Sequence, residues 1–99
     1  MSIQKQNHNK YIISFLPAAL KDLDKIEQKT AEFILDKIEA LAVSQPNLNI
    51  KKLHTKKDLY RLRAGHFRVV YQIIHNKITI LVVAIGHRKE IYQKALKRI

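Results

Sequence analysis

The chain has 99 residues, of which 46% are hydrophobic, with only two glycines and two prolines. This length and composition predict a single globular domain over residues 1–99 and exclude a chain that is disordered throughout. The sequence has no cysteine, which excludes disulfides, thiolate metal sites and cysteine nucleophiles.

The excess positive charge lies in the second half of the sequence. Residues 1–50 contain six lysines and six acids, whereas residues 51–99 contain thirteen Lys or Arg and only two acids. The second half therefore accounts for the whole formal net charge of +11. Because such concentrated charge repels itself on folding, it favours a polyanionic partner such as RNA or a ribonucleoprotein. General solubility is the alternative, but it does not require the surplus to lie in one half.

Neither end of the sequence suggests a membrane or a secretory route. Residues 1–10 are polar and lack the apolar stretch of a signal peptide, and we expect residues 1–9 to be flexible. The longest predominantly apolar run, residues 78–85, is too short to cross a bilayer. The sequence thus predicts a cytoplasmic protein with no membrane partner.

The first half predicts a strand and two helices. Residues 11–16 are rich in β-branched and aromatic side chains and predict a short strand. Pro17 suits the first turn of a helix, where its missing N–H would have no partner. Thr30 is the expected N-cap of a second helix. The apolar residues expected to face the core from these helices are Leu20, Leu23 and Ile26, followed by Phe33, Ile34, Ile38 and Leu41.

From residue 59 the apolar pattern alternates, which predicts β-strands at 59–63 and 67–74 around a tight turn. Asn76 is expected to take a positive φ in a second turn. Residues 78–85 are apolar on both faces, as in a central strand that is covered on both sides. A short basic helix with Ile91, Ala95 and Leu96 on its apolar side follows.

The resulting order is β-α-α-β-β-β-α. It predicts an α+β fold, with a small antiparallel sheet and an N-terminal helical hairpin.

Three arginines are the first candidate site residues. Arg61 and Arg63 share one face of a predicted strand, and Arg68 lies across the turn on the paired strand. Guanidinium groups on neighbouring sheet positions repel one another unless anions lie between them, so this set favours phosphate contact. Long side chains that simply extend into solvent are the alternative.

A second group follows the most apolar strand, where Gly86 precedes His87 and Arg88. A rigid strand is a good platform for aiming both side chains. Tyr92 could stack on a base or bind a phosphate, or could equally anchor the helix on the sheet. The further candidate RNA-binding residues in the basic half are Lys52, His54, Lys56, Lys57 and Lys89.

Most other catalytic chemistries lack their residues. The sequence contains no HExxH, P-loop or GxSxG motif, and Asp58 and Glu90 are isolated acids in the basic half. We therefore expect no metal and no cofactor. An enzyme with this residue set would stabilise charge at phosphorus with arginines and use the 2′-OH of RNA as the nucleophile.

The segments KKLHTKKDLYRLRAGHFRVVYQI and ILVVAIGHRKEIY, together with YIISFLPAALKDLDKI, resemble the RelE/ParE toxin superfamily and in particular its RelE branch. The resemblance covers residues 10–98. It implies a RelE-like microbial RNase fold and the toxin of a type II toxin–antitoxin system. Such toxins inhibit translation by cutting mRNA in the ribosomal A site without a metal. The implied partners are the ribosome with its mRNA, an acidic RelB-like antitoxin and, through that antitoxin, operator DNA.

The resemblance also implies roles for individual residues. Arg61 and Arg63 match the basic positions before the turn, Arg68 the arginine after it, and Arg88 and Tyr92 the arginine and tyrosine near the C-terminus. One of the first two positions is a lysine in well-studied members and is their proposed general base. Arginine at both positions stays protonated, so His54, His87 or a water polarised on the ribosome is the alternative base.

Two other functions remain open from the sequence. A ParE-like DNA gyrase inhibitor would share the fold, although that branch usually lacks the basic C-terminal helix and the GHRKEIY segment present here. The other open function is that of a corepressor, which binds nucleic acid with its antitoxin and has little catalytic activity.

Overall fold

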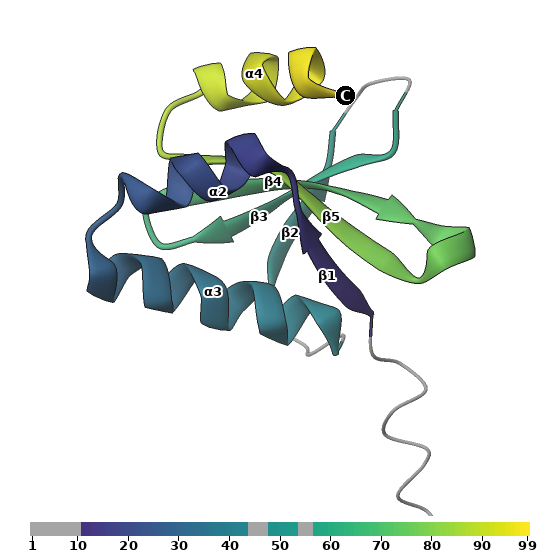
Figure 1. Ribbon diagram of the computed structural model, residues 1–99, viewed down its shortest axis with the longest axis horizontal. Coiled ribbons are helices and arrows are strands. Elements are labelled where there is room, and N and C mark those ends of the chain that lie inside the picture. Colours follow the sequence, from purple (N-terminus) through teal and green to yellow (C-terminus); the bar gives the residue numbers. More distant parts are fainter. Residues whose placement is uncertain (1–10, 44–47, 54–56) are drawn as a thin grey trace, which may run out of the picture.

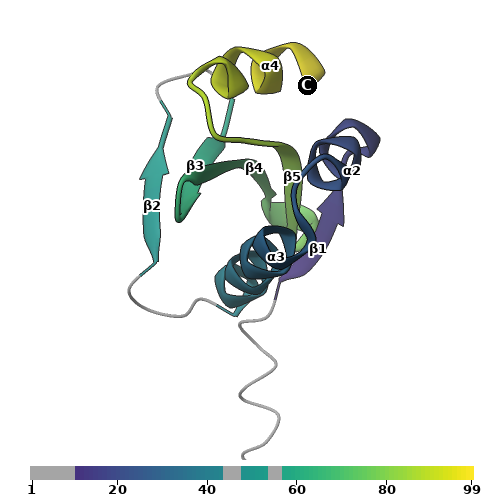
Figure 2. The same ribbon diagram turned by 90° about the vertical axis from the view of Figure 1, so that its left-hand side faces the viewer.

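The computed structural model describes residues 11–43, 48–53 and 57–99, so the expected flexibility of residues 1–9 lies outside the described part of the chain. Over the described residues a five-stranded sheet separates two helical layers (Figures 1 and 2). The elements in chain order are β1 (Ile12–Phe15), α2 (Pro17–Asp24), α3 (Gln28–Ala42), β2 (Asn49–Lys52), β3 (Leu59–Ala64), β4 (Phe67–Ile74), η1 (His75–Lys77), β5 (Thr79–Gly86) and α4 (Glu90–Arg98).

The α+β class predicted from the sequence is confirmed, but the sheet differs from the predicted one in two ways. Its strand order is β1-β5-β4-β3-β2, and β1 pairs with β5 in parallel, whereas the other neighbours are antiparallel. The expectation of an entirely antiparallel sheet was therefore wrong. The sheet also contains β2, which the sequence pattern did not predict. All four residues of β2 are exposed, so this edge strand lacks the apolar alternation that marks a strand in sequence.

Each face of the sheet has its own apolar core. The face under α2 and α3 buries Leu62, Val69 and Tyr71 among others, and the ring of Tyr71 stacks on Tyr60 with 5.5 Å between centroids. The opposite face, under α4, buries a smaller cluster that includes Val70 and Val83. Because alternate residues of one strand serve different cores, β5 is apolar on both sides, with Val82 in the first core and Val83 in the second, as predicted for residues 78–85.

The predicted helices are present: α2 begins at Pro17 as expected, whereas α3 begins earlier than predicted and some predicted core residues are exposed. The N-cap of α3 is Glu27 rather than Thr30, whose hydroxyl lies 3.4 Å from the Glu27 carboxylate inside the first turn. The N-cap of α3 therefore lies three residues before Thr30, although Thr30 has the better capping side chain. Ile34 and Ile38 are buried as predicted, whereas the predicted core residues Leu20, Phe33 and Leu96 are exposed.

The two turns that join β3, β4 and β5 use different residues to reverse the chain. Gly65 takes a positive φ of 62° in the two-residue β3–β4 turn, which is the usual role of glycine there. In the second turn the left-handed residue is Ile78, with a φ of 48°, so the expectation for Asn76 was wrong. Residues His75–Lys77 form one turn of 3₁₀ helix, and the chain reverses direction at the next residue, Ile78. The carbonyl of Ile78 then accepts a hydrogen bond from the N–H of Ile12 at 2.8 Å.

A polar network joins three elements where the β1–β5 pairing stops. Beyond Val82, the edge of β5 is paired by side chains: the N–H of Ile85 donates to Asp22 of α2 at 3.0 Å, and Arg98 of α4 donates to the carbonyl of Val83 at 3.0 Å. Arg98 also forms an ion pair with Asp22 at 2.7 Å. Burial would raise the pKa of Asp22, but the hydrogen bonds from Arg98 and Ile85 and the nearby positive charges outweigh it, so the pKa lies below its ordinary value.

Candidate functional site

The strand register brings three predicted site residues onto one face of the sheet. Arg63 of β3 lies directly opposite Arg68 of β4, and Arg61 lies two residues away on the same side of β3. Directly opposed residues in a sheet project from the same face. The three arginines therefore form a cationic surface, which we call the arginine face, on the side of the sheet that also packs α4.

Two of these arginines are held by neighbours on opposite sides. Arg68 donates through Nη1 to the backbone carbonyl of His87 at 3.0 Å, just beyond β5. Arg61 donates through Nη2 to Oδ1 of Asn49 on β2 at 2.8 Å. Each guanidinium keeps further donors for a ligand, because arginine carries five N–H groups. Arg63 is exposed and makes no side-chain hydrogen bond within the described part of the chain.

Arg61 and Arg68 are both half-buried, and Arg61 carries a buried polar atom. Its Nε is buried and has no hydrogen-bond partner among the described residues. A buried N–H without a partner costs about 1–3 kcal/mol. The direct neighbours of Arg61 on this face are Lys51 on β2 and Val70 on β4. The position therefore combines a cation, incomplete hydrogen bonding and a second cation beside it, which is an arrangement that a bound anion would relieve.

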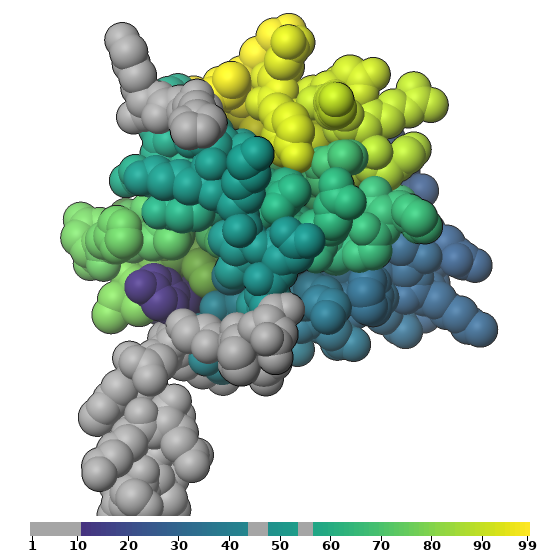
Figure 3. Space-filling view, turned by 180° about the vertical axis from the view of Figure 1, so that it is seen from behind, coloured from purple at the N-terminus to yellow at the C-terminus, as the bar shows by residue number. Residues whose placement is uncertain are grey.

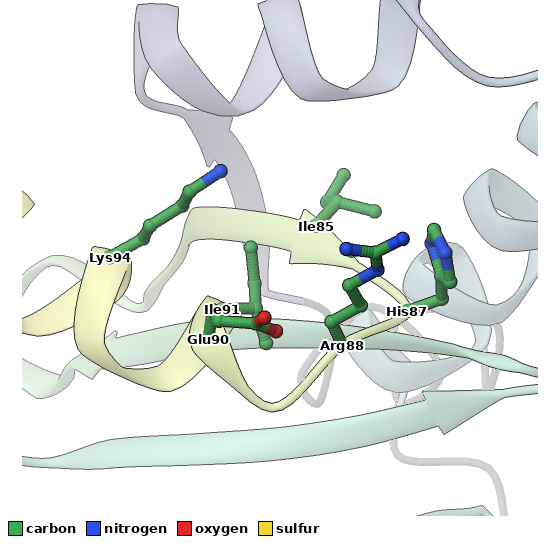
Figure 4. A pocket seen from close by; sticks show the side chains of 7 residues that line it. Ile85, His87, Arg88, Glu90, Ile91 and Lys94 are labelled. Carbon is green, nitrogen blue, oxygen red and sulfur yellow. The ribbon is translucent and has the colours of Figure 1, made fainter.

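His87 and Arg88 follow β5 at the edge of the arginine face. The His87 ring packs edge-on against Phe67 with 5.4 Å between centroids, and its carbonyl is the acceptor for Arg68. The side chain of Arg88 instead lines a separate open pocket of about 260 Å³. In Figure 4 its guanidinium points to the same side of the chain as Ile85 and the Nζ of Lys94. None of the three sheet arginines lines that pocket, so this structure does not place Arg88 with them.

Gly86 allows α4 to approach the end of β5. It lies opposite Arg68 in the register, and a Cβ at this position would lie 3.1 Å from Cδ1 of Ile91 in α4. Glycine at this strand end therefore lets the first turn of α4 pack closely beside the arginine face. Tyr92 is half-buried and packs against the core cluster under α4, so it serves at least as the helix anchor that the sequence left open.

The predicted lysine contacts are spread over different surfaces. Lys52 lies opposite Tyr60 and therefore on the other face of the sheet, where its Nζ is 5.8 Å from the Tyr60 ring and 3.8 Å from the Asp58 carboxylate. Lys57 donates to the Ile99 carbonyl at 2.7 Å, and Lys89 is exposed at the start of α4. His54 and Lys56 lie outside the described residues.

Two residues beside the arginine face were not predicted, because both belong to the unpredicted strand β2. Asn49 lies opposite Arg63, and Lys51 lies opposite Arg61. Figure 3, which views the molecule from behind, shows the teal part of the chain that contains β2 on the surface between α4 in yellow and α3 in blue. The only signal in the sequence was two lysines beside a β-branched residue, which does not distinguish an edge strand from a loop.

The arrangement can bind and neutralise a phosphodiester. The sheet holds guanidiniums on adjacent strands, and preorganised cations of this kind stabilise the charge that develops on phosphate oxygens during transfer. The imidazole of His87 does not lie beside these guanidiniums: its ring packs on Phe67, whose side chain belongs to the face under α2 and α3, and only the backbone carbonyl of His87 reaches Arg68. No helix of the described residues is long and apolar enough to span a membrane.

Comparison with known proteins identifies similar chains. The profile of the family described as "ParE toxin of type II toxin-antitoxin system, parDE" matches residues 13–92. The mRNA interferase toxin RelE of Escherichia coli (strain K12) is 33% identical over 93 residues, which covers 90% of this chain and 97% of that protein.

Solved structures agree with this match. The crystal structure of the isolated E. coli RelE toxin is 33% identical, covers 89% of this chain and 97% of that chain, and superposes with a TM-score of 0.62. The toxin in the intact E. coli RelBE toxin–antitoxin complex is 30% identical, with 80% and 98% coverage and a TM-score of 0.62.

Proposed function

Because this chain belongs to the RelE branch of the RelE/ParE superfamily of type II toxins, we propose that it is a ribosome-dependent, metal-independent endoribonuclease that cuts mRNA in the A site. The observation that carries the proposal is the pairing of Arg63 with Arg68 and the tethering of Arg61 and Arg68 on one open sheet face. Relatives named mRNA interferase support the same reaction class.

In the proposed reaction, the 2′-oxygen of the RNA forms a bond to the adjacent phosphorus while the bond from phosphorus to the 5′-oxygen breaks. The 2′-OH proton leaves to a base, and a proton is delivered to the departing 5′-oxygen. The products are a 2′,3′-cyclic phosphate and a 5′-OH end. Arg61, Arg63 and Arg68 would stabilise the charge on the non-bridging oxygens. No residue of the protein needs to form a covalent bond to the RNA.

The proton-transfer groups are a separate part of the proposal. Arg61 and Arg63 cannot act as bases, since guanidinium stays protonated at accessible pH. The candidates for proton transfer are His54, His87 and a water polarised on the ribosome, and the His87 ring, which packs against Phe67, would have to turn toward the arginines to take this role. Tyr92 would stack on a base, while Arg88 and Lys89 would reach the mRNA or the ribosome from the start of α4. Ribosome binding adds the remaining contacts that the isolated chain lacks.

Primer extension on an mRNA that is being translated in a purified system tests the proposal. We expect cleavage within the A-site codon, none on the same mRNA without ribosomes, and a cyclic phosphate at the new 3′ end. A DNA supercoiling assay with gyrase runs beside it, because the matching profile is named for ParE. Inhibition of gyrase without mRNA cleavage would overturn the proposal in favour of the ParE-like activity. If the chain neither cleaves mRNA nor inhibits gyrase, the corepressor hypothesis remains.

We propose that an acidic RelB-like antitoxin binds this chain and keeps it inactive in the cell. Solved complexes of similar toxins with RelB antitoxins support such a partner. Its acids would pair with the arginine face, and its apolar residues would displace or mimic α4 around Ile91 and Leu96. Co-expression with a neighbouring acidic reading frame should restore growth and give a complex in a pull-down. Failure to find such a partner, together with no growth arrest by the chain alone, would contradict the toxin reading.

A further inference from the structure

Asn49 is the only side chain within the described residues that hydrogen-bonds an arginine of the arginine face. It lies at the start of β2, directly opposite Arg63, but its Oδ1 accepts from Nη2 of Arg61, two residues away on β3. Diagonal neighbours on paired strands lie within reach of long side chains. The contact at 2.8 Å therefore joins the edge strand to the arginine whose Nε is buried.

The surroundings of Arg61 favour such a contact. Lys51 lies opposite Arg61 on β2, and Arg63 lies on the same side of β3, so both neighbours repel its charge. Arginine also has several rotatable bonds, and fixing it costs conformational entropy. The buried Nε makes no compensating hydrogen bond among the described residues. An uncharged acceptor can orient the guanidinium without cancelling the positive charge that a phosphate requires.

Arg68 shows the same design with a different acceptor. One of its terminal nitrogens is bound by the His87 carbonyl from the β5 side, as one terminal nitrogen of Arg61 is bound by Asn49 from the β2 side. In both cases the remaining N–H donors stay available to a ligand. The acceptor for Arg68 is backbone and cannot be removed by substitution, whereas the acceptor for Arg61 is a side chain and can.

We propose that Asn49 is a positioning residue, which holds Arg61 in the orientation that stabilises the phosphate charge during cleavage. The inference rests on the proposed function. Its contribution acts through Arg61 and is realised in the reacting complex, so it belongs to the rate constant of cleavage rather than to ribosome affinity. Asn49 itself touches neither the RNA nor the reacting atoms.

Single-turnover cleavage of mRNA on programmed ribosomes, measured over a range of toxin concentrations, tests the assignment. Asn49→Ala should lower the rate constant at saturation roughly tenfold, with a change of less than about threefold in the half-saturating concentration. Asn76→Ala makes the same chemical change in the exposed turn between β4 and β5 and should match the wild type. A thermal melt shows that each variant is folded.

A double-mutant cycle separates positioning from a general structural effect. In an Arg61→Ala background, the further change Asn49→Ala should alter the rate constant by less than about twofold. Asn49→Asp keeps an acceptor oxygen at the same distance from the backbone but adds a negative charge beside the phosphate, so it tests the orientation of Arg61 rather than the rate constant. Independent effects of the Asn49→Ala and Arg61→Ala substitutions on the rate constant would overturn the assignment.

One measurement does not depend on cleavage. Nitrogen NMR of the arginine side chains reports rotation of the Arg61 guanidinium, which we expect to be slow in the wild type and in Asn49→Asp but fast in Asn49→Ala. Equal rotation in all three would reject the tether even if the wild type cleaves mRNA. Conversely, a wild type that never cleaves rejects the proposed function, and the NMR result still decides whether Asn49 orients Arg61.

Discussion

The two faces of the sheet differ in how completely they are covered. The face under α2 and α3 has one continuous apolar core, whereas the other face is apolar only where α4 covers it and cationic over β2, β3 and the start of β4. Both faces are built from the same strands. In β3, Leu62 points into the first core while its neighbours Arg61 and Arg63 point to the other side.

Alternate side chains of one strand therefore have different roles: those on the covered face stabilise the fold, and those on the open face form the candidate site. Side chains of the covered face contribute by burial, which depends on how well they fill space. Side chains of the open face contribute charge at fixed positions and are exposed or half-buried, so stability depends less on them. Substitutions one residue apart should therefore have effects of different kinds, and the following experiments test that contrast from the largest effect to the smallest.

The largest effect is expected at the covered face. Leu62 is fully buried, so Leu62→Ala should lower the free energy of unfolding by about 2–5 kcal/mol through lost burial and a cavity. Urea denaturation followed by circular dichroism measures it. Leu20→Ala is the matched control, because Leu20 is 46% exposed and its truncation should cost less than about 1 kcal/mol. Similar losses at both sites would contradict the assigned core.

The open face should give the opposite result. Arg68→Ala should reduce A-site cleavage on the order of 100-fold, because it removes a preorganised cation from the phosphate. Its unfolding free energy should change by less than about 1 kcal/mol, since Arg68 contributes one hydrogen bond outside the core. Lys77→Ala removes an exposed cation from the turn between β4 and β5 and serves as the control. Wild-type cleavage by Arg68→Ala, or its failure to fold, would contradict the separate roles of the two faces in stability and activity.

The network of Asp22 joins α4 to the covered side and should have an intermediate, pH-dependent effect. Its native pKa lies below the unfolded value, so its contribution is full above the unfolded pKa, about 4, and is lost as the pH falls through the native pKa. Asp22→Asn should cost about 1–3 kcal/mol at pH 7 because Arg98 keeps a half-buried charge without its partner. The difference from wild type should shrink in acid.

Urea denaturation at pH 7 and at acid pH measures this effect. Asp24→Asn on the same helix is the control, because Asp24 is exposed. If the difference in unfolding free energy between wild type and Asp22→Asn does not change with pH, an ionised Asp22 is not the contact that holds α4 in place.

The smallest effect is expected for the exposed ion pair between Lys52 and Asp58. The two side chains are 60% and 55% exposed and 3.8 Å apart, so Asp58→Asn should change stability by less than about 0.5 kcal/mol. Thermal melts at low and high salt measure it. A clear loss that disappears at high salt would mean that this pair fastens β2 to β3 more strongly than its exposure implies.

The sequence by itself determined the α+β class, the family, and the shared face of Arg61, Arg63 and Arg68. These rest on local properties: period-two alternation places every second side chain on one face, and a short turn with glycine sets the pairing across it. The family prediction is confirmed by the profile match and by relatives of 33% identity. The roles of the individual site residues stay predictions for the experiments above.

Only the tertiary structure decided the remaining features, because each depends on residues far apart in the chain. The parallel pairing of β1 with β5 joins residues more than sixty positions apart, and no local pattern encodes the direction of such a pair. All residues of β2 are exposed, and hydrogen bonds to β3 make it a strand, so the positions of Asn49 and Lys51 beside the arginine face were not predicted. Arg98 and Asp22 looked like ordinary surface charges until packing brought α2 and α4 to the open edge of β5, where unpaired backbone groups need partners.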